Sequence, residues 1–191
     1  MTPYSVILFF HVGSALVLAA ALVVEGMVLG RLRKVTSARD AEPWFGMWKT
    51  VPWTASLSLL VLLLTGGYLT GVLGQWPLAW PKAALVALVL IGAFGGITSK
   101  RMRLARKACS GSKQSDTECL RRMKDPLLKV SVNVKIALLF AAVLLMTTTP
   151  GLYASSGIVA GGALVGFLVS LPGLSRRTPQ RALETGRESR T

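Results

Sequence analysis

The stretch YSVILFFHVGSALVLAAALVVEGMVLGRLRK, residues 4–34, decides the class of fold to which this chain belongs. Its residues 4–29 are apolar or uncharged except at His11 and Glu25. About 20 such residues cross the hydrocarbon core of a bilayer as an α-helix. The basic cluster RLRK follows the apolar run directly and no Lys or Arg precedes it, which is the reverse of a secretory signal. The sequence therefore predicts a retained transmembrane helix with its N-terminus outside.

The composition of the whole chain also indicates a membrane protein. Of its 191 residues, 52% are hydrophobic and 16% are charged, whereas a soluble domain has about 25% charged residues. The net charge of +14 does not indicate a nucleic-acid partner, because the basic residues flank apolar blocks instead of forming one recognition surface. Such flanking charge is typical of the cytoplasmic side of membrane proteins, where it attracts anionic lipids.

Five apolar segments are near the length that a bilayer requires, and all Lys and Arg residues except Lys82 and Lys135 lie between or after them on one side. Backbone groups in hydrocarbon need internal partners, so the segments should be helices. The sequence predicts an all-α, polytopic membrane bundle at 1–174, with the N-terminus outside, and a disordered, basic cytoplasmic tail at 175–191. The predicted spans are about 4–29, 51–73, 82–98, 127–146 and 152–171.

The polar segments between these spans carry aromatic and sulfur-containing side chains. Residues 43–53 hold several tryptophans and should lie along the inner membrane interface, which tryptophan prefers. The segment CSGSKQSDTEC, residues 109–119, reads as a flexible link. We expect Cys109 and Cys119 to be free thiols, because the predicted topology puts them in the reducing cytoplasm.

Glycines spaced as GxxxG recur in the apolar segments and should let helices approach closely. The pattern favours a compact bundle and leaves open whether the contacts lie within one chain, between copies of a homo-oligomer or with other membrane subunits. The pairs are Gly67/Gly71, Gly92/Gly96, Gly157/Gly161 and Gly162/Gly166.

His11 is the single histidine of the chain and lies about 10 Å inside the outer end of the first span. One interpretation is a haem or metal ligand or a proton-transfer group. The other is a neutral histidine bonded to a neighbouring helix. A single chain with one histidine cannot supply bis-histidine ligation to a haem b.

Three further ionisable residues are candidates for function or for structural pairing. Glu25 lies on the same helix face as His11, about 21 Å along the axis. Lys135 lies at a depth similar to that of Glu25, so we expect an intramembrane ion pair; the alternative is that Lys135 reaches the inner headgroups. Lys82 either reaches the outer headgroups or points toward His11.

The order of these features resembles a known group of bacterial membrane bundles. It comprises a histidine in the first span, a basic link, VPWTASLSLLVLLLTGGYLTG at 51–71, WPKAALVALVLIGA at 80–93, SKRMRLARK at 99–107 and a short TTTPG turn. The chain resembles, over about residues 4–150, the HemJ-type protoporphyrinogen oxidases and the CopD-type copper-resistance proteins. The resemblance implies the bacterial inner membrane, possible haem binding, and functional roles for His11 and Lys82. A fifth apolar segment and a basic tail distinguish this chain.

Three functions follow as alternatives. The first is a haem- or porphyrin-linked redox membrane protein, with His11 as ligand or acid–base group and Lys82 binding a propionate. The second is a non-catalytic assembly factor or subunit of a membrane complex. The third is a small proton-coupled carrier that uses the His11–Glu25 face of the first span and Lys135. No metal-binding motif such as HExxH or CxxC occurs.

Overall fold

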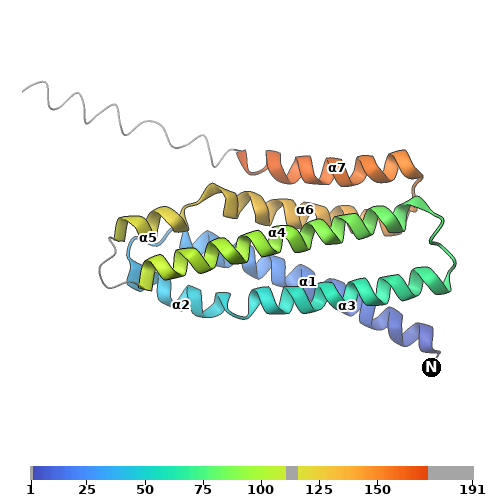
Figure 1. Ribbon diagram of the computed structural model, residues 1–191, viewed down its shortest axis with the longest axis horizontal. Helices are drawn as coiled ribbons and strands as arrows, with labels where there is room; N and C mark the ends of the chain where they lie inside the picture. The colour runs from blue at the N-terminus through green and yellow to red at the C-terminus, as the bar shows by residue number, and fades with distance from the viewer. Residues whose placement is uncertain (1, 111–115, 172–191) are drawn as a thin grey trace, which may run out of the picture.

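The computed structural model describes residues 2–110 and 116–171, which form helices and turns without a strand (Figure 1). The helices are α1 Pro3–Leu32, α2 Ala38–Trp48, α3 Val51–Val72, α4 Ala79–Ser110, α5 Asp116–Met123, α6 Pro126–Thr148 and α7 Leu152–Leu168. The predicted tail at 175–191 lies outside the described residues.

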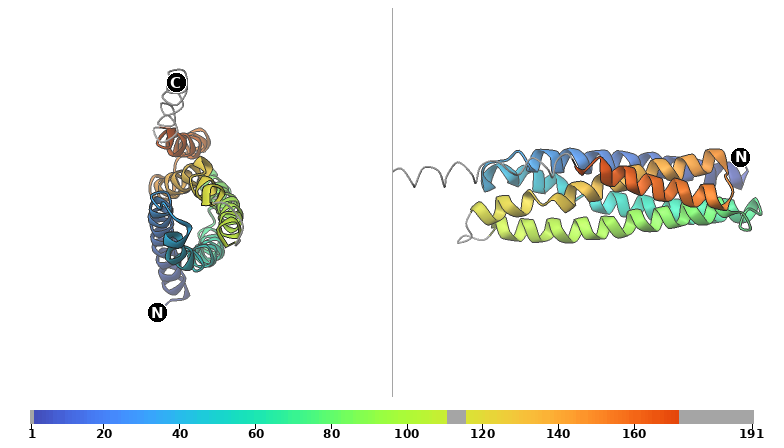
Figure 2. Two further views of the ribbon diagram at one scale, coloured as in Figure 1. Left: turned by 90° about the vertical axis from the view of Figure 1, so that its left-hand side faces the viewer. Right: turned by 90° about the horizontal axis from the view of Figure 1, so that it is seen from above.

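Four long helices form a closed ring. α1 packs on α3, α3 on α4, α4 on α6 and α6 on α1, while α7 packs outside the ring against α6 and α4 (Figure 2). Within the described residues, four helical segments are long and apolar enough to cross a membrane: Pro3–Leu32, Asp40–Val72 (which contains most of α2 and all of α3), Ala79–Lys107 and Arg121–Thr148 (the end of α5 and all of α6). The 17 residues of α7 reach about 25 Å, less than the roughly 30 Å of a hydrocarbon core. A fifth span and the orientation of the chain therefore stay predictions.

The distribution of apolar side chains matches a bundle surrounded by lipid. Leu18, Leu22 and Leu62 are buried at the centre of the ring. The outer surface is also apolar: Phe9 is 72% exposed and Phe140 is 71% exposed. A soluble protein rarely exposes such a continuous apolar surface, so the fold is that of a membrane-type helical bundle.

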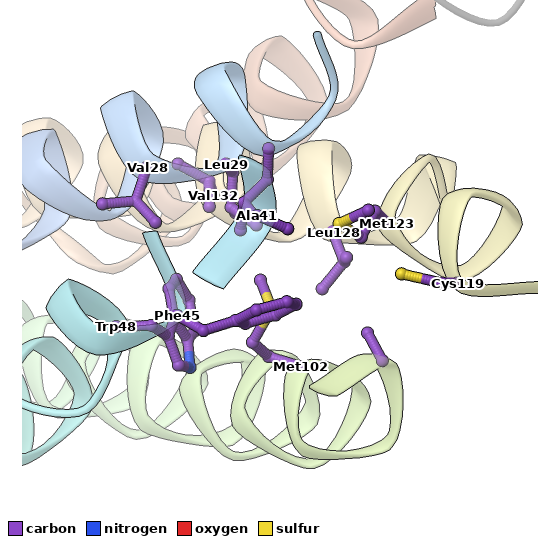
Figure 3. Close-up of a cluster of buried hydrophobic side chains, with 12 residues drawn as sticks. Val28, Leu29, Ala41, Phe45, Trp48, Met102, Cys119, Met123, Leu128 and Val132 are labelled. Atoms are coloured by element: carbon purple, nitrogen blue, oxygen red, sulfur yellow. The ribbon is translucent and has the colours of Figure 1, made fainter. Parts of the chain in front are cut away.

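The end of the bundle where α1 ends and α6 begins, near Arg33 and Lys129, is called the basic end and carries a compact cap of short helices. α2 and α5 pack there against the ends of α1, α4 and α6 (Figure 3). Phe45 and Trp48 of α2 are buried in this cap, together with Met102 of α4. Within the segment 43–53, Trp53 is exposed, whereas Phe45 and Trp48 pack inward. The position of this segment along the membrane interface stays a prediction.

The expectation of free thiols is wrong, because Cys109 and Cys119 form a disulfide. Cys109 lies near the end of α4 and Cys119 lies in α5, and the packing of these two helices brings their Cα atoms within 4.9 Å. The predicted flexible link is therefore helical at both of its ends; its central residues, 111–115, lie outside the described part of the chain.

Of the GxxxG pairs, Gly162/Gly166 of α7 makes the closest helix contact. A Cβ atom added at Gly166 would lie 2.6 Å from the Cα atom of Val134, and one added at Gly162 would lie 3.0 Å from the Cβ atom of Ala141. Added Cβ atoms at Gly67 and Gly161 would meet nothing within 4 Å. Gly162 and Gly166 thus let α7 lie directly on α6, whereas the other pairs do not make a comparable backbone approach.

Candidate functional site

His11 lies on α1 and contacts α3 at the end of the bundle opposite the basic end. Its Nδ1 atom is 3.0 Å from Oγ1 of Thr65, and the Thr65 hydroxyl donates to the carbonyl oxygen of Val61 at 2.7 Å. Since the single hydroxyl proton is used in that bond, we assign Nδ1 as the donor to Thr65. Nε2 then carries the lone pair of the neutral ring and can accept a hydrogen bond.

Gly66 provides the space that the imidazole ring occupies. A Cβ atom at this position would lie 3.2 Å from Cε1 of His11, which is closer than ordinary van der Waals contact. Sequence reasoning missed both Thr65 and Gly66 as partners of His11. The signal available was the Thr-Gly-Gly sequence within an otherwise apolar span, which combines a hydroxyl donor with a small residue.

His11 lines a cavity of about 280 Å³ at what we call the tryptophan end, where α3 turns into α4. Trp76, Trp80 and Met146 line the same cavity, together with leucines of α3 and α4. Among the described residues, Trp80 Nε1 is the single buried side-chain nitrogen or oxygen atom without a hydrogen-bond partner. Leaving such a donor unsatisfied is costly, so a ligand oxygen that reached Nε1 would be stabilised there. The tryptophan-end cavity is therefore lined by an imidazole, by an indole whose N–H has no partner, and by apolar side chains.

Lys82 lies in the first turn of α4. Its side chain is exposed, and it is not among the residues that line the tryptophan-end cavity. The exposed position agrees with a lysine that reaches outward toward headgroups.

The tryptophan-end cavity meets only part of what a haem b requires. His11 and Met146 are a known axial pair for haem iron, and both line the cavity. However, its volume of about 280 Å³ lies below the roughly 300–1,000 Å³ of pockets that hold drug-sized ligands. A haem b is larger than a typical drug-sized ligand. No Lys or Arg lines the cavity to bind a propionate. The residues present do not fit a whole haem b.

Glu25 and Lys135, the second predicted group, lie together inside the ring. The Lys135 ammonium donates a hydrogen bond to Oε1 of Glu25, and the two side chains are 2% and 6% exposed for Lys135 and Glu25, respectively. The pair lines a second cavity of about 300 Å³, the ion-pair cavity, which Trp48, Ser56 and Ser99 also line. The charges compensate each other in an environment where either alone would be very unfavourable.

His11 and Glu25 face the same interior but belong to different cavities. Ser14, Leu18 and Leu22 are buried on the intervening face of α1. Leu18 and Leu22 form a cluster with Leu62 of α3. This apolar cluster lies between the two cavities: Leu18 and Leu22 line the ion-pair cavity and Leu62 lines the tryptophan-end cavity.

Other polar groups in the bundle join helices to each other. Ser131 of α6 and Thr98 of α4 share a hydrogen bond of 2.6 Å, and Asn133 Nδ2 donates to Oγ of Ser170 at 3.0 Å. These bonds account for the polar start of α6. Within the described residues, no group of three or more His, Cys, Asp or Glu side chains lies close enough to hold a metal ion.

Comparison with known proteins gives no match. No family model matches the chain, no curated protein matches it, and no solved structure matches it. The candidate function therefore depends on the geometry of the two interior cavities.

Proposed function

We propose that this chain is an integral membrane protein that binds a small redox-active ring, of the size of a quinone or phenol, in the tryptophan-end cavity. The observation that carries the proposal is that the His11 imidazole and the unpartnered Trp80 indole line one apolar cavity of about 280 Å³. The proposal keeps His11 as the acid–base group and replaces the porphyrin by a ring that the cavity accommodates.

The hydrogen-bonding groups of the cavity are complementary to such a ring. The Trp80 N–H is a donor and suits a carbonyl oxygen, whereas Nε2 of His11 is an acceptor and suits a hydroxyl group. Thr65 holds the imidazole in this tautomer through Nδ1. Histidine exchanges protons near neutral pH, so His11 is suited to accept a proton from the hydroxyl of a reduced ring.

Access from the bilayer also favours an apolar ligand. The first residues of α1 are exposed, and this end of the helix diverges from the other helices of the ring (Figures 1 and 2). A lipid-soluble ring can approach the tryptophan end from the side, through hydrocarbon, without crossing the basic end.

A titration with decylubiquinone tests the proposal. Trp76 and Trp80 line the cavity, so binding should quench tryptophan fluorescence in a saturable way. Replacing His11 by Ala removes one hydrogen bond and should weaken binding by about 3- to 10-fold. The control is Val12→Ala, because Val12 is 50% exposed on the same helix and should leave binding unchanged.

Two results would reject this ligand. The first is quenching that does not saturate, or that is identical in the His11→Ala variant. The second is a Soret absorption band in the gently purified protein that His11→Ala removes, which would identify haem as the ligand instead.

A proton-coupled carrier is the second candidate, and the buried Glu25–Lys135 pair beside an interior cavity is the observation that favours it. Ionisable groups inside membrane bundles often mark transport paths. In liposomes, Glu25→Gln should then abolish pH-dependent solute flux. Flux equal to that of the unaltered protein would reject the carrier.

A further inference from the structure

A third cavity opens between α1 and α6 toward the basic end. It measures about 320 Å³ and is lined by Arg33 on the α1 side and by Lys129 and Asn133 on α6. Gly26 and Gly30 form its α1 wall, which leaves room beside the helix backbone. No carboxylate is among the lining residues, all of which lie in the described part of the chain. The residues that line the cavity therefore carry two positive charges and no negative charge.

The position of these two cations corresponds to the headgroup region of a bilayer. Arg33 follows the buried Glu25 by eight residues, about 12 Å along the helix, and Lys129 precedes the buried Lys135 by six residues, about 9 Å. Both cationic side chains are half-buried, in contrast to the nearly complete burial of the ion pair. A phosphate placed between them would lie at the membrane surface, with hydrocarbon beginning a turn or two deeper.

An apolar groove continues from this cavity along the outside of α6. It measures about 490 Å³ and runs between α6 and α7, and Asn133 lines both the groove and the cationic cavity. From Asn133 to Leu144, the last α6 residue that lines it, the groove extends about 17 Å. One leaflet contributes about half of a hydrocarbon core roughly 30 Å thick. The groove thus has the length of one acyl chain in its leaflet.

We propose that an anionic glycerophospholipid binds here, with its phosphate between Arg33 and Lys129 and one acyl chain in the α6–α7 groove. Basic pockets between membrane helices recognise anionic headgroups by charge. A free anion would use the cations but not the groove, and a neutral lipid would use the groove but not the cations. The single surface joins both features through Asn133. The site does not depend on the function of the tryptophan-end cavity.

Native mass spectrometry of the full chain in detergent, titrated with phosphatidylglycerol or phosphatidylcholine, tests the proposal. The unaltered protein should retain phosphatidylglycerol more strongly than phosphatidylcholine. The double variant Arg33→Gln/Lys129→Gln should lose about 30-fold in affinity for phosphatidylglycerol, at about 5-fold for each charge near the surface. The matched control is Lys100→Gln/Arg103→Gln, which removes two exposed cations of α4 near the same end and should keep the affinity.

A second variant tests the groove separately. Gly161→Leu adds a side chain where a Cβ atom meets nothing within 4 Å, so it should fill the groove without displacing α7. It should reduce retention of phosphatidylglycerol while helical content by circular dichroism stays unchanged. Equal retention of the two lipids, equal losses in the two double variants, or displacement of the lipid by millimolar inorganic phosphate would each overturn the proposal.

Discussion

The ion pair inside the ring gives the largest stability effect that the structure predicts for a single substitution. Lys135→Met keeps most of the length of the side chain but removes its charged end, and Glu25 then stays buried without its partner. Removing one member of a buried pair costs about 3–5 kcal/mol in soluble proteins. We expect about 3 kcal/mol, the lower value, because a membrane-inserted unfolded state also finds polar partners.

The assay is unfolding of the purified protein by increasing SDS in mixed micelles, followed by tryptophan fluorescence. Trp48 lines the ion-pair cavity and reports on its opening. A loss of 3 kcal/mol corresponds to more than a 100-fold change in the unfolding equilibrium, roughly tenfold for each 1.4 kcal/mol. The control Lys82→Met makes the same substitution at an exposed lysine and should change stability by less than about 0.5 kcal/mol.

A double-mutant cycle separates the pair from the two individual side chains. Glu25→Leu/Lys135→Met replaces both charges by apolar groups and should be far more stable than the sum of the single variants predicts. The reasoning is refuted if Lys135→Met is as mild as Lys82→Met, or if the effects of the two substitutions simply add.

Three further predictions concern close approaches and the cysteines. Gly66→Ala should displace the His11 ring and weaken decylubiquinone binding at least 3-fold, as a lost hydrogen bond would, by the fluorescence titration. The control Gly13→Ala should leave binding unchanged, because an added Cβ atom there meets nothing and Gly13 does not line the cavity. Gly166→Ala should separate α7 from α6 and lower stability in SDS by about 1–3 kcal/mol, whereas Gly161→Ala should not. Protein unfolded without reductant should show no iodoacetamide adduct by mass spectrometry, because both cysteines are in the disulfide; two adducts would contradict that bond.

Much of the membrane bundle could be predicted from the sequence because the bilayer sets the length of its helices. The end of α4 was harder to predict: the predicted span ends at residue 98, whereas the helix continues to Ser110. Hydropathy falls at the first charge, but SKRMRLARK consists mostly of good helix formers. The spacing of Thr98, Met102 and Ala105, all buried, is also helical and was the signal for a longer helix.

The two interior sites differ in how far the sequence could indicate them. Glu25 and Lys135 could be paired because depth along a span follows from counting residues, and opposite charges at one depth attract. The partners of His11 could not be identified, because the face that α3 presents to α1 depends on rotation and crossing of the helices. The disulfide was missed because the expected compartment, and not the packing of α4 and α5, decided the prediction.

The length of α4 means that a small tilt at one of its ends displaces the other end by several ångströms. Its 32 residues form one helix about 48 Å long, which reaches from the wall of the tryptophan-end cavity to the disulfide in the cap. A rod of this length converts a 5° tilt at one end into a displacement of about 4 Å at the other. A small rotation of α4 about its Pro81 end would thus move its other end, where the disulfide lies, by several ångströms while the helix itself stays unchanged.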